Sequence, residues 1–205
     1  MDTRDPVRFL QAEVARLRDE NRDLKEELGI LRASVRGLAS LQDLIQRLQP
    51  RANVMALLDD LLAAALAVLD AGDGSLLLVD DDTGELVFAV VHGQARSRLT
   101  GYRLPPGQGI AGWVVASKKP HIVEDARHDP RFSPVVDDTF DFRTQSLACV
   151  PLLDGGRVLG VIEALNKASG REFTLEDHDL LVVLAQLVSF AILRAEAYTE
   201  AGSGG

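Results

Sequence analysis

Two hairpin patterns constrain the fold of this 205-residue chain more than any other feature of its sequence. The first joins apolar runs over 74–80 and 85–92, and the second joins runs over 146–153 and 157–167. Each pair of runs is separated by a short turn rich in Gly and Asp, which is typical of antiparallel hairpins. The chain is therefore predicted to build an antiparallel sheet.

Helical patterns flank the predicted strands. Residues 55–69 form a nearly continuous apolar run of helical length, and a closing helix is expected from Thr174 because apolar residues recur there at helical spacing. The predicted fold class is α+β, with an antiparallel sheet flanked by helices. The other expected elements are short strands near 102–104 and 121–124, a helix over 110–117, and a polar connection over 125–144.

A heptad repeat runs through the first forty residues. Apolar residues recur at alternating spacings of four and three, and one polar residue, Asn21, interrupts them. Such an Asn fixes register and two-strandedness in a parallel coiled coil. Glu13 and Glu20 each stand five places before a basic residue, so opposite charges would meet across an in-register pair. The predicted dimerisation seam is Val14, Leu17, Asn21, Leu24, Leu28, Leu31, Val35 and Leu38. The alternative is one amphipathic helix lying on its own domain.

The predicted organisation is a coiled coil over 1–40, one globular domain over 41–198 and a flexible tail over 199–205. Residues 1–50 hold nine basic and nine acidic residues, so the net charge of −9 belongs to the rest of the chain. An acidic domain repels phosphate backbones and anionic lipid, so neither nucleic acid nor a membrane is an expected partner. The longest apolar run, 61–69, is far shorter than the roughly 18 residues of a membrane span. A cytoplasmic location is expected.

Residues 107–112 spell the GxGxxG pattern of dinucleotide-binding proteins. That fingerprint requires a strand before the first Gly, but Pro105 and Pro106 stand there, and no acidic residue lies about 20 positions beyond Gly112. We therefore interpret the glycines as a tight loop. The loop would deliver backbone N–H groups to the start of the 110–117 helix, where they could hold an anion or a carbonyl.

No metal site and no catalytic residues are predicted. His121, Glu124, Asp125 and His128 would cluster on a helix, but the strand expected over 121–124 scatters their side chains. The nucleophile, zinc-protease and phosphate-loop signatures do not occur, and the single Cys149 excludes chemistry that needs two thiols. The chain is predicted not to be an enzyme.

Glu163 is the most informative single residue of the predicted strands. It stands within the apolar run 158–165, where a carboxylate facing the core is costly unless it is paired or faces a polar cavity. A cavity lined by this strand is one interpretation. A solvent-facing position on the strand is the other.

Five segments together resemble the GAF domain family over about residues 41–198. They are Gly74–Asp80, Gly107–Gly112, Phe142–Leu152, Gly160–Lys167 and Phe173–Asp177, in the order that the family has them. The resemblance implies an antiparallel sheet flanked by helices, with a small-molecule pocket on one face and a dimerising helical bundle on the other.

Asn166, Lys167, Phe173 and Asp177 resemble the signature of the cyclic-nucleotide-binding GAF domains of phosphodiesterases and cyclases, although His178 replaces the final Glu. In that subgroup the Lys and Asp form a salt bridge away from the ligand, and Thr174 with Asp177 also fits a helix-capping arrangement. The pocket residues of the subgroup correspond to Ser75, Val91, His92, Ile110, Ala111, Phe140, Thr144 and Glu163, and Trp113 is expected beside them.

Two departures from the subgroup bear on the ligand. His92 stands where an Asp often meets the base, and residues 140–145 lack the usual Gly and Arg, so the pocket could hold another ligand or none. Related enzymes that reduce free methionine sulfoxide need several cysteines, whereas Cys149 is expected in the core.

The predicted function is that of a non-catalytic, homodimeric signalling protein. It would sense a small molecule, for which the resemblance suggests a cyclic nucleotide, and relay the signal to a partner protein. The alternative is a ligand-free dimeric adaptor that acts through protein–protein contacts.

Overall fold

The computed structural model describes residues 9–22, 24 and 54–202. The chain divides into two compact units, Met1–Gly37 and Leu38–Gly205. The predicted boundary between coiled coil and domain at residue 40 lies near this division.

The first unit contains helical backbone over residues 9–22. Val14, Leu17 and Leu24 are exposed, with 46%, 50% and 58% of their surfaces accessible, and Asn21 is exposed with them. Arg16 pairs with glutamates three residues before it and four residues after it within the same helix. The other seam residues, Leu28, Leu31, Val35 and Leu38, lie outside the described residues, so the coiled coil stays a prediction.

The second unit is built on a six-stranded sheet in which all neighbouring strands are antiparallel. The strand order is β3-β2-β1-β6-β5-β4. The strands are β1 (Ala71–Val79), β2 (Leu86–His92), β3 (Arg103–Leu104), β4 (His121–Val123), β5 (Leu147–Asp154) and β6 (Arg157–Lys167). The two predicted hairpins are confirmed as β1–β2 and β5–β6, and they meet through β1 and β6 at the centre of the sheet.

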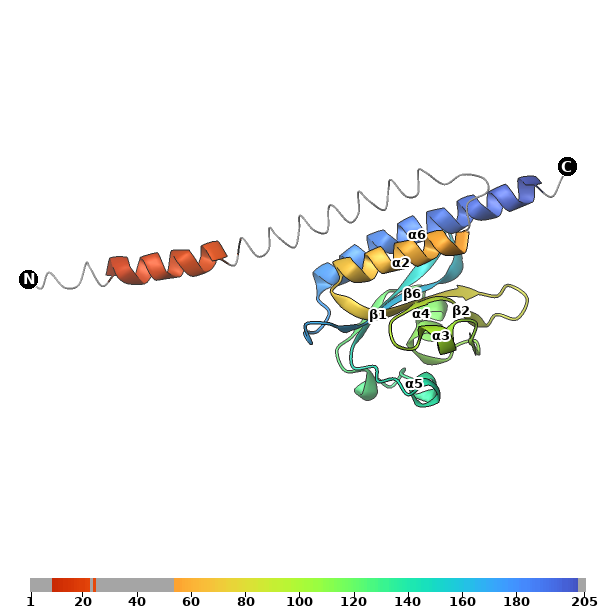
Figure 1. The fold of residues 1–205 in the computed structure, drawn as a ribbon, viewed down its shortest axis with the longest axis horizontal. Helices are drawn as coiled ribbons and strands as arrows, with labels where there is room; N and C mark the ends of the chain where they lie inside the picture. Colours follow the sequence, from red (N-terminus) through yellow and green to blue (C-terminus); the bar gives the residue numbers. More distant parts are fainter. Residues whose placement is uncertain (1–8, 23, 25–53, 203–205) are drawn as a thin grey trace, which may run out of the picture. The chain divides into compact units, whose positions relative to one another are not determined.

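Helices cover both faces of the sheet, as Figure 1 shows. Two long helices, α2 (Val54–Val68) and α6 (Leu175–Gly202), lie on one face. The short helices lie on the other face. They are α3 (Arg96–Leu99), α4 (Gly109–Ser117), the 3-10 turn η1 (Ala126–His128) and α5 (Val135–Phe140).

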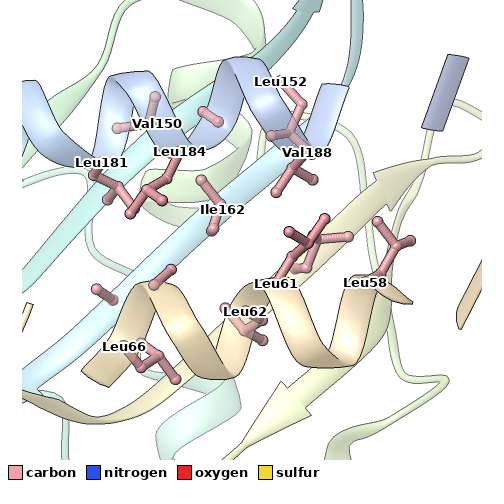
Figure 2. Close-up of a cluster of buried hydrophobic side chains, with 14 of the residues drawn as sticks. Leu58, Leu61, Leu62, Leu66, Val150, Leu152, Ile162, Leu181, Leu184 and Val188 are labelled. Atoms are coloured by element: carbon pink, nitrogen blue, oxygen red, sulfur yellow. The ribbon is translucent and has the colours of Figure 1, made fainter. Parts of the chain in front are cut away.

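The larger core fills the space between α2, α6 and the sheet (Figure 2). Leu61 and Leu62 of α2, Ile162 of β6, and Leu181 and Leu184 of α6 are each at most 1% exposed. Burial of such leucine and isoleucine side chains stabilises a domain by roughly 1.5–3 kcal/mol each. These contacts fix both long helices to one face of the sheet.

Strand alternation separates this core from the layer on the other face. In β6, Ile162 and Ala164 face the long helices, whereas Val161 and Leu165 belong to the cluster beneath α3, α4 and α5. Successive side chains of a strand point to opposite faces, so Glu163 also points into this second layer.

Two stretches differ from the sequence prediction. The connection over 125–144, predicted only as polar, contains η1 and α5. The predicted tail over 199–205 overlaps α6, which continues to Gly202 through helix-favouring Glu and Ala residues.

Among the described residues, one segment, Leu175–Ala197 of α6, is long and apolar enough to cross a membrane. Of its most apolar 18-residue window, 39% is buried inside the domain. Leu181, Leu184 and Val188 of this segment pack in the core between α6 and the sheet. Core helices of globular domains have the same length and composition, so the segment is a weak indication of a membrane span.

Candidate functional site

A cavity lies on the face of the sheet that α3, α4 and α5 cover. The space between its walls is about 790 Å³, and part of that volume is open to solvent. Eight of the nine residues predicted to bind ligand line it. They are Ser75, Val91, His92, Ile110, Ala111, Phe140, Thr144 and Glu163.

The floor of the cavity is a polar pair on the two central strands. Ser75 of β1 and Glu163 of β6 are opposed in register, and Ser75 Oγ donates a hydrogen bond of 2.9 Å to Glu163 Oε2. The exposed fractions of these residues are only 2% and 9%. The sequence left open whether Glu163 faces a cavity or solvent, and in the structure its side chain faces the cavity.

Burial shifts the pKa values of two titratable groups at this floor, Glu163 and Cys149. It raises the pKa of the Glu163 carboxyl above its ordinary value, while hydrogen bonds from Ser75 and Cys149 act in the opposite direction. Burial, together with the charge of Glu163, also raises the pKa of the Cys149 thiol well above its ordinary value. Cys149 therefore stays a thiol at neutral pH, and only Glu163 of the two is placed to exchange a proton with a ligand.

A second buried carboxylate, Asp137 of α5, closes the loop on one side of the cavity. Its Oδ1 accepts a 2.8 Å hydrogen bond from Thr144 Oγ1, and its Oδ2 accepts one of 2.8 Å from the Thr144 N–H. Arg127 of η1 donates to the same carboxylate over 3.3 Å. The two bonds from Thr144 tie α5 to the segment that leads into β5, so Asp137 shapes the wall that Phe140 and Thr144 form.

The start of α4 forms the opposite wall. Glycine is required at several positions there, because a side chain would be strained or would clash. Gly107 and Gly109 have φ angles of 77° and 68°, which side chains rarely adopt. A Cβ on Gly112 would lie 2.4 Å from the backbone carbon of Gly107. The GxGxxG spacing thus folds the loop back against α4, and the backbone at 108–111 lines the cavity.

His92 connects the cavity to the opposite layer of the domain. It lines the cavity from the end of β2, and its Nε2 lies 3.1 Å from Asp59 Oδ1 on α2. Arg96 of α3 donates to the same Asp59 oxygen over 2.9 Å. One carboxylate on a long helix therefore contacts both a cavity residue and a short helix of the cavity layer.

Trp113 is the predicted site residue that lies outside the cavity lining. Its ring is 5.1 Å from the ring of His121, and the Arg131 guanidinium stacks 4.7 Å from its centroid. Arg131 directly precedes Phe132 and Ser133, which do line the cavity. Trp113 thus supports the loop behind the wall.

The four motif residues near the start of α6 also lie outside the lining. Lys167 Nζ pairs with Asp177 Oδ2 over 2.5 Å and stands 5.6 Å from the Phe173 ring centroid. Thr174 and Asp177 exchange side-chain and backbone hydrogen bonds in a capping box. Asn166, with a φ of 50°, forms hydrogen bonds with the backbone of the segment that leads into β5. Their contacts are local and join β6, α6 and β5.

Over the residues that the structure describes, no three His, Cys, Asp or Glu side chains converge in a way that could hold a metal ion. His121 bonds Asp129, whereas His128 bonds Asp125. The histidines considered in the sequence therefore have separate carboxylate partners.

The sequence model of the GAF domain matches residues 53–192 of this chain. The chain belongs to the GAF domain family. The match spans the whole sheet and most of α6, and the cavity described above lies entirely within it.

Among known proteins, this GAF domain is similar to the probable 3',5'-cyclic phosphodiesterase pde-5 of Caenorhabditis elegans. The two are 31% identical over an alignment of 145 residues, and the match covers 66% of this chain and 20% of the phosphodiesterase. The chain therefore spans about a fifth of the length of that relative.

Two solved structures share the fold. The GAF domain of a phosphoenolpyruvate-protein phosphotransferase from Coxiella burnetii has a TM-score of 0.72 at 22% identity, covering 82% of this chain and 96% of that one. The free methionine-R-sulfoxide reductase of Neisseria meningitidis has a TM-score of 0.64 at 24% identity, covering 80% and 89%. One fold thus serves proteins with different activities.

Sequence reasoning missed several lining residues of the GAF domain. Asp73, Gln108, Phe132, Ser133 and Asp137 reach the cavity from a strand end, a loop and a short helix. The only signal for Asp137 is an acidic pair after Pro134, and nothing in the sequence separates Asp137 from its exposed neighbour Asp138.

Proposed function

We propose that this GAF domain is a regulatory, non-catalytic sensor that binds a small molecule in its cavity. The observation that carries the proposal is the Ser75–Glu163 pair, a nearly buried carboxyl on the floor of an otherwise largely apolar cavity. Burying a carboxyl in such a place lowers the stability of the domain. Groups that lower stability are retained where they serve function, so we assign Glu163 a role in ligand binding.

The thiol chemistry of the domain supports a role without catalysis. Sulfoxide-reducing relatives with this fold need several cysteines, whereas this chain has Cys149 alone. Cys149 is fully buried and holds its proton because of that burial. It therefore lacks both the access and the thiolate that a nucleophilic cysteine needs.

Cyclic nucleotides are the first ligands to test. The support is the similarity to a cyclic phosphodiesterase and the eight lining residues at positions that match cyclic-nucleotide-binding GAF domains. The relay would act on a partner protein in the cytoplasm, with nucleic acid and membranes not among the partners.

The relay that we propose runs through His92. A ligand that contacts His92 changes its interaction with Asp59 and so favours one packing of α2 over another. The ligand shifts the balance between the two packings only by the difference in its affinity for them.

Asp59→Asn is expected to keep ligand binding but to remove the effect of ligand on self-association, because the amide weakens the contacts to His92 and Arg96. Sedimentation velocity with and without ligand measures this effect. Asp60→Asn is the matched control, since Asp60 is the exposed neighbour on α2. A ligand effect that is equal in both variants would contradict the relay.

Homodimerisation is part of the proposal, with α6 contributing to the interface. Val183 and Phe190 are 41% and 53% exposed and lie seven residues apart, so they share one face of the helix. Large apolar side chains on one helix face favour packing against a second helix.

Phe190→Glu is expected to weaken self-association about 100-fold, because it places a charge where an apolar contact is proposed. The free energy of unfolding should change by less than about 0.5 kcal/mol, since the side chain is half exposed. Analytical ultracentrifugation measures the first effect and denaturant titration the second. Leu153→Glu, at an exposed apolar residue of the β5–β6 hairpin, is the matched control and should leave association unchanged.

The experiment that tests the function is a thermal-shift screen of nucleotides and metabolites on the full chain and on Ala111→Leu. Ala111 is buried in the α4 wall, so a leucine there occupies part of the cavity. We expect at least one compound to raise the melting temperature of the native chain and not of the variant. No shift in either protein, with no small molecule copurifying in native mass spectrometry, would favour the ligand-free adaptor.

A further inference from the structure

Carboxylates dominate the charged side chains that line the cavity. Three carboxylates line it, those of Asp73, Asp137 and Glu163. Among the lining residues, all within the described part of the chain, there is no Lys or Arg. Two cations stand behind the lining. Arg98 donates to the Phe140 carbonyl over 2.6 Å, and Arg127 pairs with Asp137 over 3.3 Å, so one of the three carboxylates, Asp137, is neutralised by an arginine.

One feature of the wall favours anions, namely the N-terminus of α4 at residues 108–111. The positive end of a helix is equivalent to about half a charge and stabilises an anion. Two full like charges in a partly buried site repel each other more strongly than such a half charge attracts an anion. When Glu163 is ionised, its repulsion of an anion that fills the cavity therefore exceeds the attraction of the helix end.

Aromatic rings supply much of the remaining wall. Phe88, Phe132, Phe140 and Phe142 line the cavity. Tyr102 packs edge-on against Phe140 with centroids 5.1 Å apart and fixes that ring. Aromatic faces attract planar rings by stacking and cations through their negative faces.

The carboxylates differ in their capacity to accept a further hydrogen bond. Asp137 already receives two bonds from Thr144 and one from Arg127. Glu163 accepts from Ser75 through Oε2 and also from the Cys149 thiol, and a carboxylate that accepts two bonds still has acceptor capacity for a donor on the ligand.

From this lining we infer that the cavity selects a planar nitrogen heterocycle or aryl cation, uncharged or positive, that donates N–H groups to Glu163, in preference to an anion. The inference rests on the proposed function and narrows its ligand. Among nucleobase compounds, the uncharged nucleoside should therefore bind better than its cyclic monophosphate. Stacking on the phenylalanines supplies the apolar part of the affinity, and Glu163 selects for the donor.

Calorimetric titration of the full chain with two matched pairs of probes tests this inference. The first pair is guanosine and cyclic GMP, and the second is benzamidine and benzoate, which share one ring and differ in the sign of their charge. We expect guanosine and benzamidine each to bind about tenfold or more tightly than the anionic partner, a difference of about 1.4 kcal/mol.

Glu163→Gln should weaken benzamidine binding by about tenfold or more, whereas Asp138→Asn, on the same helix as Asp137 but outside the lining, should not change it. Circular dichroism confirms that both variants fold. Equal or tighter binding of cyclic GMP and benzoate would overturn the inference and leave the proposed function standing. If none of the four probes binds, the inference is overturned. If no compound of the wider ligand screen binds either, the proposed function is overturned as well.

Discussion

Gly160→Ala is expected to destabilise the domain by about 3 kcal/mol or more, the upper end of the cost of overpacking a core. Gly160 lies in β6 between β1 and β5, opposite Leu78 and Leu152. A Cβ at this position would lie 2.0 Å from the carbonyl oxygen of Leu77. The obstacle is backbone in a central strand, so the clash is relieved only by separating β1 from β6.

Gly156→Ala is the matched control for this prediction. Gly156 is in the turn of the same hairpin, and no atom lies within 4 Å of the position that its Cβ would take. Urea denaturation of both variants measures the free energy of unfolding. The prediction is contradicted if the two variants unfold at the same urea concentration.

Glu163→Gln is expected to have two opposite effects, a loss of ligand recognition and a gain in stability. Burial raises the pKa of this carboxyl in the folded domain, so the folded domain binds the proton more tightly than the unfolded chain. The stability that the protonated carboxyl provides is present below its unfolded pKa and is lost as the pH rises through its folded pKa. Glutamine does not ionise, so the variant avoids this loss.

We therefore expect Glu163→Gln to be more stable than the native chain by about 1–2 kcal/mol at neutral pH, and the difference to vanish in acid. Denaturation over a series of pH values measures both quantities. Glu124→Gln, at an exposed position after β4, serves as the control and should be neutral throughout. A variant that is less stable at neutral pH would show that Glu163 supports the fold instead of binding.

The hairpins could be predicted from the sequence because the signals for them are local. The Asp and Gly residues of the 82–84 and 154–156 turns fix which runs pair, and alternation fixes which side chains share a face. The pairing of β1 with β6 joins residues 88 positions apart at Ser75 and Glu163. No local signal encodes that pairing, and the resemblance to the GAF family implied only that the hairpins belong to an antiparallel sheet.

The site was predictable to the extent that motifs mark it. The resemblance indicated eight residues that the structure brings together around one cavity. It did not indicate Asp137, because the role of that residue depends on contacts with Thr144 and Arg127 that form only in the folded chain. Trp113 lies behind the wall and not in the lining, since only the first turn of α4 forms the wall and Trp113 follows it.

The most direct test of the central claim is an electron-density map of the cavity in crystals grown with the tightest-binding probe. We expect density for the probe against Ser75 and Glu163, enclosed by the start of α4 and by Phe140. A probe bound elsewhere on the domain, or a cavity closed by its own side chains, would contradict the account.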